Sequence, residues 1–289
     1  MLAFGIAIAL GLAAIGVYLL SERTLNAALP VAGASIVVPT DIAAIQHGQH
    51  VVGAIALCTE CHAANLGGAV IVDDESVRVV APNLTRGGVG GRLRDTDFAR
   101  AIRDGVDPNG RALWLMPSDE YHRMSSTDLA DVIAYLKSLP PISTSLPGNE
   151  IRPLGRLMLV TGQLDLLPAE GIGGAPAPAP APAPAASPEY GAYLVELAGC
   201  ARCHGPGLSG GKVPGASAGA VVAANITPAA LGSWSEADFF RAMRTGRRPD
   251  NSAIDTLMPW PYYAQMSDLE LTAIWQFLEV VPARPTGTG

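Results

Sequence analysis

The run Cys58-Thr-Glu-Cys61-His62 recurs later in the chain as Cys200-Ala-Arg-Cys203-His204. Together the two runs contain all four cysteines of the sequence. Two thiols three residues apart can form thioethers with the two vinyl groups of one porphyrin, and the adjoining histidine can then supply an axial nitrogen to the iron. The spacing therefore predicts covalent attachment of two haem c groups, with His62 and His204 as iron ligands.

Other uses of paired cysteines fit this sequence less well. The two pairs of a zinc ribbon usually lie about 15–20 residues apart, whereas the offset here is 200 − 58 = 142 residues. A thioredoxin-like redox pair would explain one C-x-x-C spacing but not the histidine after both. Four cysteines in 289 residues are also too sparse for a disulfide-stapled domain.

The composition is that of a folded chain long enough for two domains. Of its 289 residues, 49% are hydrophobic and 16% are charged, so burial is plentiful and general disorder is not expected. The formal net charge is −7. Because no basic stripe or nucleic-acid motif is present, nucleic acid is not expected as a partner. An acidic face could steer a basic redox partner, or it could simply keep the protein soluble.

The N-terminal segment has the character of a membrane anchor. Residues 2–20 carry no charge, and as a helix they would span about 28 Å, enough for a hydrocarbon core. Tyr18 lies near the end of this run, as interfacial aromatic residues do. A cleaved signal peptide is the alternative, but the candidate cleavage site at Ala32-Gly33-Ala34 lies far beyond the apolar run. We therefore expect an uncleaved transmembrane helix over residues 1–21 and a linker over residues 22–39.

The two halves of the chain match beyond the cysteine runs. Asn83-Leu84-Thr85 and Asn225-Ile226-Thr227 each begin 25 residues after the first cysteine of their run (83 − 58 and 225 − 200). Met116-Pro117 and Met258-Pro259 follow, 258 − 116 = 142 residues apart, which is also the offset between the cysteine runs. A match maintained at one offset indicates duplication of a single domain.

Each half is expected to be a small helical domain, one over residues 40–150 and the other over residues 188–289. Apolar residues recur at helical spacing, and no stretch shows convincing strand alternation, so the fold class is expected to be mostly α. Ser235, with Asp238 three residues later, has the pattern of a capping box. The expected helices cover residues 41–57, 96–104 and 127–139 in the first half, and 189–199, 236–245 and 268–280 in the second.

Two segments join the halves. Residues 151–174 are expected to form an extension whose leucines pack onto the first domain, namely Leu154, Leu157, Leu159 and Leu167. Residues 175–187 form an alternating Ala-Pro linker, for which proline favours polyproline II. Because polyproline II is semi-rigid, this linker could either let the second domain swing between partners or fix it at a distance.

A six-coordinate iron needs a second axial ligand in each half. Met116 and Met258 precede proline, which biases them to extended backbone on a loop, where a thioether can point at iron. Met124 and Met266 precede a helix cap, where an apolar residue usually packs as a staple. We therefore expect Met116 and Met258 to be the ligands.

Three further histidines are expected to have no role at iron. His122 has no histidine counterpart in the second half, where Ala264 stands, so we expect it to be a surface residue. His47 and His50 lie on the helix before the first cysteine run, and we expect exposed or hydrogen-bonded helix residues there. The Asn-x-Thr segments that begin at Asn83 and Asn225 could bond a haem propionate, but a plain Asx turn is equally compatible.

Taken together, these motifs resemble class I cytochrome c domains, in particular the dihaem and multihaem cytochrome c subunits that accept electrons from membrane dehydrogenases. The resemblance covers residues 41–140 and 188–282. It implies His/Met ligation, a haem crevice walled by the first and last helices of each domain, and electron transfer. In bacteria c-type haem is attached outside the cytoplasm, so the resemblance also implies a single-pass protein of the inner membrane with its haem domains on the periplasmic side.

The two halves also differ in ways that the resemblance does not explain. The helix before Cys58 is one residue longer from Gly48 (58 − 48 = 10) than its partner is from Gly191 (200 − 191 = 9). The first half also carries the acidic run Asp73-Asp74-Glu75. These differences bear on how each haem is placed.

The expected function is electron transfer by two haems. The protein would act as a tethered carrier or as the cytochrome subunit of a respiratory, photosynthetic or dehydrogenase complex. We expect redox proteins as partners, no small-molecule substrate, and no residue acting as a catalytic acid, base or nucleophile. The alternatives are a haem enzyme, such as a dihaem peroxidase or a thiol-oxidising cytochrome, and an interaction module in which the haems are structural.

Overall fold

The computed structural model describes residues 2–30, 35–173, 179–213 and 222–288. Two sequence features fall outside these ranges: the Ala32-Gly33-Ala34 site, and the last residue of the extension, Gly174, with the start of the Ala-Pro linker that follows it. By internal contacts the chain divides into two compact units, which are described separately. The first unit comprises residues 1–39, 59–122 and 133–177, and the second comprises residues 40–58, 123–132 and 178–289.

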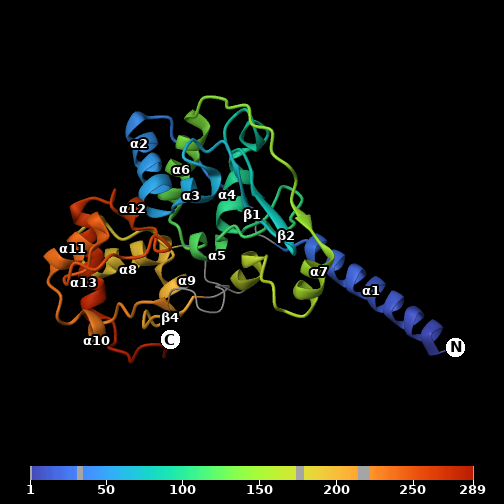
Figure 1. Ribbon diagram of the computed structural model, residues 1–289. Helices are drawn as coiled ribbons and strands as arrows, with labels where there is room; N and C mark the ends of the chain where they lie inside the picture. Colours follow the sequence, from blue (N-terminus) through green and yellow to red (C-terminus); the bar gives the residue numbers. More distant parts are fainter. Residues whose placement is uncertain (1, 31–34, 174–178, 214–221, 289) are drawn as a thin grey trace. The chain divides into compact units, whose positions relative to one another are not determined.

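The first unit begins with a long apolar helix, α1 (Leu2–Asn26) (Figure 1). Over Ala3–Asn26 it is long and apolar enough to cross a membrane, with a mean hydropathy of 2.3 in its best window and none of that window buried. The helix continues beyond residue 21, where the linker was expected to begin. Its last turn enters the unit, because Leu25 is only 8% exposed.

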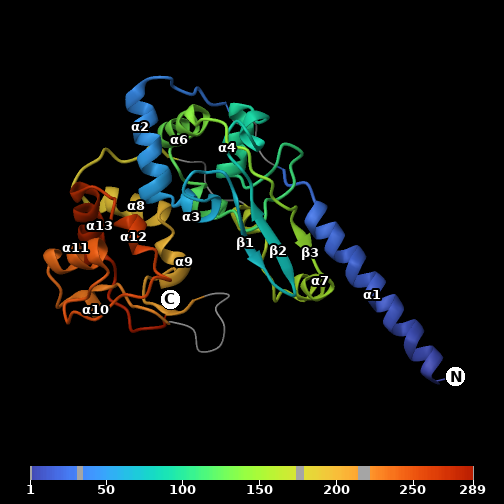
Figure 2. The same cartoon turned by 45° about the horizontal axis from the view of Figure 1, so that its top comes forward.

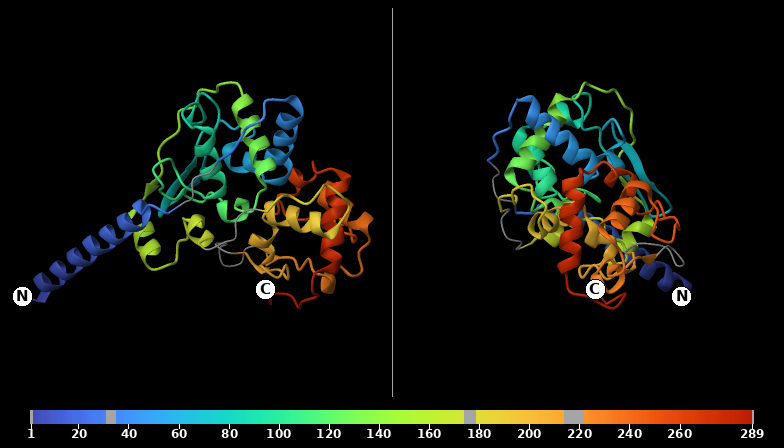
Figure 3. Two further views of the ribbon diagram at one scale, coloured as in Figure 1. Left: turned by 180° about the vertical axis from the view of Figure 1, so that it is seen from behind. Right: turned by 90° about the vertical axis from the view of Figure 1, so that its left-hand side faces the viewer.

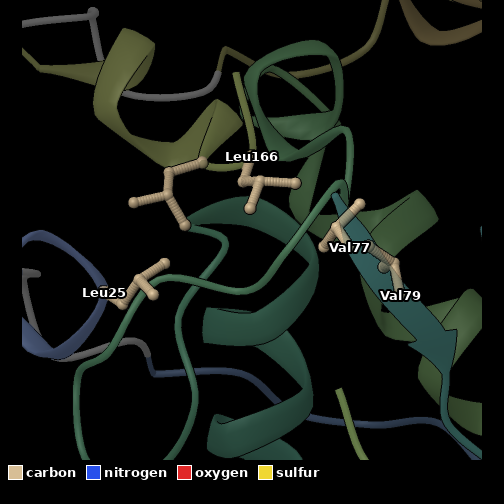
Figure 4. Close-up of a cluster of buried hydrophobic side chains, with 5 residues drawn as sticks. Leu25, Val77, Val79 and Leu166 are labelled. Atoms are coloured by element: carbon tan, nitrogen blue, oxygen red, sulfur yellow. The ribbon is translucent and has the colours of Figure 1, made fainter. Parts of the chain in front are cut away.

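Leu25 belongs to a cluster of buried side chains that joins three parts of the first unit (Figure 4). Val77 and Val79 come from a strand, whereas Leu166 and Leu167 come from the extension after residue 150. The cluster therefore ties the end of α1 to both a sheet and the extension. Leu167 is 3% exposed and packs in this cluster, and the extension over residues 151–174 stays a prediction.

The first unit contains a small antiparallel sheet that the sequence did not predict (Figure 2). Its strands are β1 (Ala69–Asp73), β2 (Val77–Ala81) and β3 (Glu150–Ile151), in the order β1-β2-β3. Burial alternates along β2, so a strand pattern is present there. The strand is only five residues long, and of its two outward positions one is charged, Arg78, and the other apolar, Val80. This short, incomplete alternation was not recognised in the sequence, and the expectation of no strands was wrong.

The remaining elements of the first unit are helical and short. Figure 1 labels most of them. They are α3 (Cys58–His62), η2 (Val89–Gly91), α4 (Asp95–Arg103), α5 (Ser118–Tyr121), the second half of α6 (Ser126–Ser138), α7 (Pro153–Val160) and η3 (Pro168–Ile172). Helices α4 and α6 lie within one residue of their expected bounds. Ser125 caps α6, because its Oγ accepts a hydrogen bond from the Asp128 amide at 3.0 Å.

The second unit is mainly helical, with one two-stranded sheet. Its elements are α2 (Ile42–His50), η1 (Val51–Ile55), the first half of α6, α8 (Pro188–Leu197), α9 (Cys200–His204), β4 (Gly211–Lys212), β5 (Val222–Ala223), α10 (Pro228–Leu231), α11 (Glu236–Thr245), α12 (Trp260–Tyr263) and α13 (Asp268–Val280). Helices α11 and α13 have the predicted bounds. Ser235 and Asp238 form the expected capping box on α11.

Both halves of the duplication use one glycine to bring two helices together. A Cβ atom on Gly48 would lie 1.9 Å from the Asp131 carbonyl oxygen, and one on Gly191 would lie 2.0 Å from the Ala273 oxygen. The two carbonyls are 273 − 131 = 142 residues apart, which is the offset of the repeat. Each helix that leads into a cysteine run therefore crosses the last helix of its repeat at backbone contact, which no larger residue would permit.

The extra residue before Cys58 is absorbed by a π-helical turn. Segment η1 follows α2 and has π geometry, whereas α8 ends without one. A π-turn adds one residue to a helix while leaving its two ends in register. Gly48 can therefore keep its contact although ten residues, instead of nine, separate it from the cysteine run.

About half of the chain is helical, in agreement with the predicted dominance of α structure. The division into units does not follow the repeat, because residues 40–58 and 123–132 group with the second unit. The expected domains over 40–150 and 188–289 therefore stay a prediction.

Candidate haem sites

Each cysteine run forms a single helical turn, α3 in the first repeat and α9 in the second. Positions three residues apart share one face of a helix, so the two cysteines of each run lie on the same side. All four cysteines are partly exposed. By contrast, His62 and His204 are buried, at 7% and 8% exposure. The turn therefore presents two thiols at the surface and holds the following imidazole inside.

The two buried histidines have matching hydrogen bonds. Nδ1 of His62 donates to the carbonyl of Pro82 at 2.8 Å, and Nδ1 of His204 donates to that of Ala224 at 2.7 Å. Each acceptor lies 20 residues after its histidine. Because a carbonyl can only accept, Nδ1 carries the proton, and Nε2 is the nitrogen that can bind a metal.

Burial sets the charge of these imidazoles. It lowers the pKa of both His62 and His204, and the hydrogen bond to a carbonyl offsets only part of that effect. The neutral imidazole is the form that coordinates iron. Both histidines are therefore held in the tautomer and charge state of a metal ligand.

The Asn-x-Thr segments brace the loop after each histidine. Oδ1 of Asn83 accepts from the amide and hydroxyl of Thr85 at 2.9 and 2.7 Å, and its Nδ2 donates to the Ile142 carbonyl at 2.7 Å. Asn225 repeats these bonds with Thr227 and with Arg284 as the carbonyl partner. Of the two interpretations of these segments, the structure shows the Asx turn, here used to tie the loop to the chain beyond the last helix.

The two Met-Pro segments adopt the same local backbone. The amide of Ser118 donates to the Met116 carbonyl at 2.7 Å, and that of Trp260 donates to the Met258 carbonyl at 2.7 Å. Both methionines are partly buried and lie on loops, directly before α5 and α12. By contrast, Met124 and Met266 are 1% and 2% exposed. The second pair therefore packs in the core, as expected, and the first pair stays the candidate for the sixth ligand.

Comparison with curated proteins identifies relatives of the chain. It is 26% identical over 262 residues to the fructose dehydrogenase cytochrome subunit of Gluconobacter japonicus, covering 81% of this chain and 52% of that protein. It is 28% identical over 253 residues to a diheme cytochrome c-type protein of Cereibacter sphaeroides, covering 78% of this chain and 82% of that protein. The chain is therefore similar to cytochrome c proteins, one of which is the cytochrome subunit of a dehydrogenase.

One further relative shares a larger part of this chain than of its own length, and the search for a matching family model found none. A nicotinate dehydrogenase subunit of Pseudomonas putida is 30% identical over 223 residues, covering 71% of this chain but 18% of that protein. The chain thus spans about half of the first relative and less than a fifth of this one. By its name, the Gluconobacter japonicus relative is the cytochrome subunit of a dehydrogenase.

The residues of the two cysteine runs suit the haem c that relatives named as cytochromes c imply. Among the described residues, no cluster of three or more histidine, cysteine or carboxylate side chains could hold a metal ion by itself. One buried, neutral imidazole beside two surface thiols is instead the donor set that a haem needs, because the porphyrin supplies the other four nitrogens. The chemistry of the donors thus fits haem c and does not fit a protein-only metal site.

The expectation that His122 is a surface residue was wrong. Its side chain is 13% exposed, and its Nδ1 donates to the Arg103 carbonyl at 3.1 Å, beside Asp104. That carbonyl belongs to the last turn of α4, where backbone carbonyls have no amide of the same helix to bond. The imidazole of His122 supplies the missing donor. His122 therefore secures the end of α4.

The two other histidines, both in the second unit, pair with carboxylates. His47 Nδ1 lies 2.8 Å from Asp131, and His50 Nε2 lies 2.9 Å from Glu270. Both therefore have hydrogen-bond partners, as expected.

One contact near a candidate ligand was not foreseen. The amide of Leu115 donates to the Leu166 carbonyl at 2.8 Å, so the extension holds the loop that carries Met116. The only sign of this contact in the sequence is the largely apolar character of residues 164–167. That character does not identify Leu115 as the residue contacted.

Proposed function

We propose that the chain is a dihaem electron-transfer subunit. The observation that carries this proposal is the repeated histidine geometry, in which the imidazole after each cysteine run is buried and bonds a carbonyl 20 residues later. If only one cysteine run bound a haem, the histidine of the other run would not need to keep the same burial and hydrogen bond. When bound, each haem iron accepts and releases one electron, and the chain supplies the ligands, the orientation and the low-polarity surroundings.

The proposed ligands follow from the repeat. Cys58 and Cys61 would hold the first haem, with His62 and Met116 as its axial ligands. In the second repeat the corresponding residues are Cys200, Cys203, His204 and Met258. Methionine as the sixth ligand raises the reduction potential relative to a second histidine, which suits a subunit that accepts electrons from a dehydrogenase.

The proposed location is a bacterial inner membrane, with α1 as a single-pass anchor and the haems on the periplasmic side. Support for the anchor comes from the length and hydropathy of α1 and from its exposure. Support for the side comes from the chemistry of haem c attachment, which takes place outside the cytoplasm in bacteria. The anchor would keep the cytochrome beside a membrane-bound partner.

The proposed partner is a membrane oxidoreductase complex, with a dehydrogenase as electron donor. Support comes from the names of the relatives, which include a fructose dehydrogenase cytochrome subunit. We propose that residues 40–150 and 188–289 carry one haem each, joined by the extension over 151–174 and the Ala-Pro linker over 175–187.

Counting the haems tests this function. The purified chain is denatured, and its covalent haem is measured by pyridine haemochrome absorbance against protein mass. Two haems per chain are expected, with one remaining in the Cys58→Ala/Cys61→Ala variant and one in the Cys200→Ala/Cys203→Ala variant. Fewer than two haems in the unaltered chain would overturn the proposal. Rapid carbon monoxide binding to the reduced protein would instead indicate an open iron site, as in a haem enzyme.

A further inference from the structure

Helix α7 exposes an apolar face although it was expected to pack inward. Leu154 and Leu157 are 47% and 48% exposed, and Val160 is 36% exposed. Residues three positions apart lie on one face of a helix, so these three side chains form a single stripe. We call this stripe, Leu154, Leu157 and Val160, the α7 stripe.

The opposite face of α7 fixes which way the stripe points. Gly155 is buried against the turn between β1 and β2, where a Cβ atom would lie 2.1 Å from the Ser76 carbonyl oxygen. In addition, the Arg152 amide donates to the same carbonyl at 2.9 Å. Rotation of α7 that buried the stripe would break both contacts, so the outward direction of the stripe is set by backbone packing.

Arg156 attaches α7 to the end of the apolar helix α1. Its Nη1 donates to Ser21 Oγ at 2.7 Å, its Nη2 lies 2.7 Å from Glu22 Oε1, and its guanidinium carbon lies 4.5 Å from the centre of the Tyr18 ring. Figures 1 and 3 both show α7 beside the last turns of α1. These turns are where the uncharged run ends and the first charged residues follow.

We propose that the α7 stripe inserts into the surface of the lipid bilayer that α1 spans. The inference rests on the proposed membrane anchoring of α1 and adds a second contact with the same bilayer. Tyrosine and arginine side chains commonly lie at the headgroup level of membranes. The contact of Arg156 with Tyr18 therefore places α7 at that level, where its leucines can leave water for the acyl chains.

Continuity favours lipid over a protein as the occupant of the stripe. The stripe adjoins α1, whose own exposed side chains include Tyr18 at 51% and Leu20 at 52%. A bilayer around α1 would cover both surfaces at once. Burial of three aliphatic side chains at an interface is favourable, because it removes apolar area from water.

The charges near α7 indicate that anionic lipid is not required. Arg78 and Arg152 form ion pairs with Asp73 and Glu150. The nearby cations are thus already neutralised, and little positive charge remains to attract acidic headgroups. The contact should therefore form equally well on a zwitterionic bilayer.

Photolabelling of the full haem-loaded chain in phosphatidylcholine nanodiscs, one chain per disc, tests the proposal. An apolar diazirine dissolved in the bilayer is activated with glutathione present as an aqueous scavenger, and labelled residues are read by mass spectrometry. We expect labelling of α7 within about threefold of that of α1 per residue, and little labelling of the exposed loop over residues 143–145. The Leu154→Gln/Leu157→Gln variant should lose the α7 signal and keep that of α1.

The outcomes separate this inference from the anchoring on which it rests. Labelled α1 with unlabelled α7 would overturn the stripe contact and leave the anchor intact. If neither helix were labelled, both proposals would fail. Labelling of α7 in nanodiscs but protection of it in native membranes would show that a partner protein covers the stripe, which also overturns the proposal. A strict need for phosphatidylglycerol would contradict the apolar mechanism.

Discussion

The amide of Leu115 donates a hydrogen bond to the carbonyl of Leu166 at 2.8 Å, across 51 residues of sequence (166 − 115). Leu115 immediately precedes Met116, and Leu166 is 1% exposed. At the equivalent position of the second repeat, the Leu257 amide donates instead to the side chain of Asp255 at 2.8 Å. One candidate methionine loop is therefore held by a distant segment and the other by its own residues.

This difference predicts that Leu166→Ala affects the first haem alone. Loss of the buried side chain should destabilise the extension by about 2–5 kcal/mol and loosen the Met116 loop. The charge-transfer absorbance of methionine-ligated ferric haem should fall by about half, because one of two sites is affected. The matched variant Asp255→Ala, which removes the acceptor of the Leu257 amide, should weaken the second site instead. An equal response of both haems to either variant would contradict this asymmetry.

Methionine substitutions should separate ligands from core residues. Replacing Met116 or Met258 with alanine should lower the reduction potential of one haem and leave the other unchanged, as measured by redox titration. Replacing Met124 or Met266 should instead reduce the free energy of unfolding by about 2–5 kcal/mol, because both are buried, while the potentials stay near their original values. A fall in potential on changing Met124 would reverse the assignment.

The pair of His50 and Glu270 predicts a pH-dependent contribution to stability. The hydrogen bond and charge of Glu270 outweigh burial and raise the pKa of His50 above its ordinary 6.5. Burial alone would raise the pKa of Glu270, but His50 holds it below its ordinary 4.5. The pair is thus fully charged between these values, and its stabilisation is lost as pH rises through the raised pKa of His50 or falls through the lowered pKa of Glu270.

Thermal unfolding of the wild type and of His50→Gln measures this effect. The wild type should be more stable by about 1 kcal/mol near pH 5.5, and the difference should vanish near pH 9. Glu270→Gln serves as the partner variant and should show the same window. A difference that persisted unchanged at about pH 9 would show that packing, and not charge, is responsible.

The π-helical turn predicts tolerance of a deletion. Removing Gly53 from η1 gives the first repeat the nine-residue spacing of the second, so α2 can continue into the cysteine run as an α-helix. Both haems should still attach. Deleting Ala192 from α8 should instead rotate the start of that helix by about 100°, move Gly191 off Ala273, and prevent loading of the second haem. Haem staining of the two variants provides the comparison.

Shortening the Ala-Pro linker tests whether the second domain swings between partners or is held in place. If the linker is polyproline II, as the sequence predicts, removal of about half of residues 175–186 would shorten its reach by roughly 19 Å. If the second domain travels between partners, electron transfer from donor to acceptor should slow in membranes. Unchanged turnover would exclude the swinging motion and favour a linker that fixes the second domain at a distance.

Sequence alone was sufficient for features that depend on residues close together in the chain. The spacing within Cys58-Thr-Glu-Cys61-His62 is what covalent attachment of a haem requires, so the motif can be recognised without knowledge of the fold. Helices α11 and α13 were predicted to the residue because their caps, Ser235 and Ser267, lie within three residues of the amides that they satisfy. The duplication was visible because both copies kept the same offset.

Other features depended on contacts between distant residues. Strand β2 is stabilised by its partner strands and by the core beneath it. Five residues of mostly apolar sequence do not show which residues will form that core or those partner strands. The leucines of α7 are apolar enough for a core, and only the close approach of Gly155 to Ser76 turns them outward. His122 carried no local sign that it would meet the end of α4.

The local chain thus determined the proposed positions of haem attachment and where several helices begin and end, since covalent spacing and capping act over a few residues. Tertiary structure decided which segment supports Met116, which face of α7 is exposed, and how one extra residue is accommodated before Cys58. Each of these depends on the free energy of packing groups that lie far apart in sequence, and hydrophobicity, which drives that packing, does not specify direction.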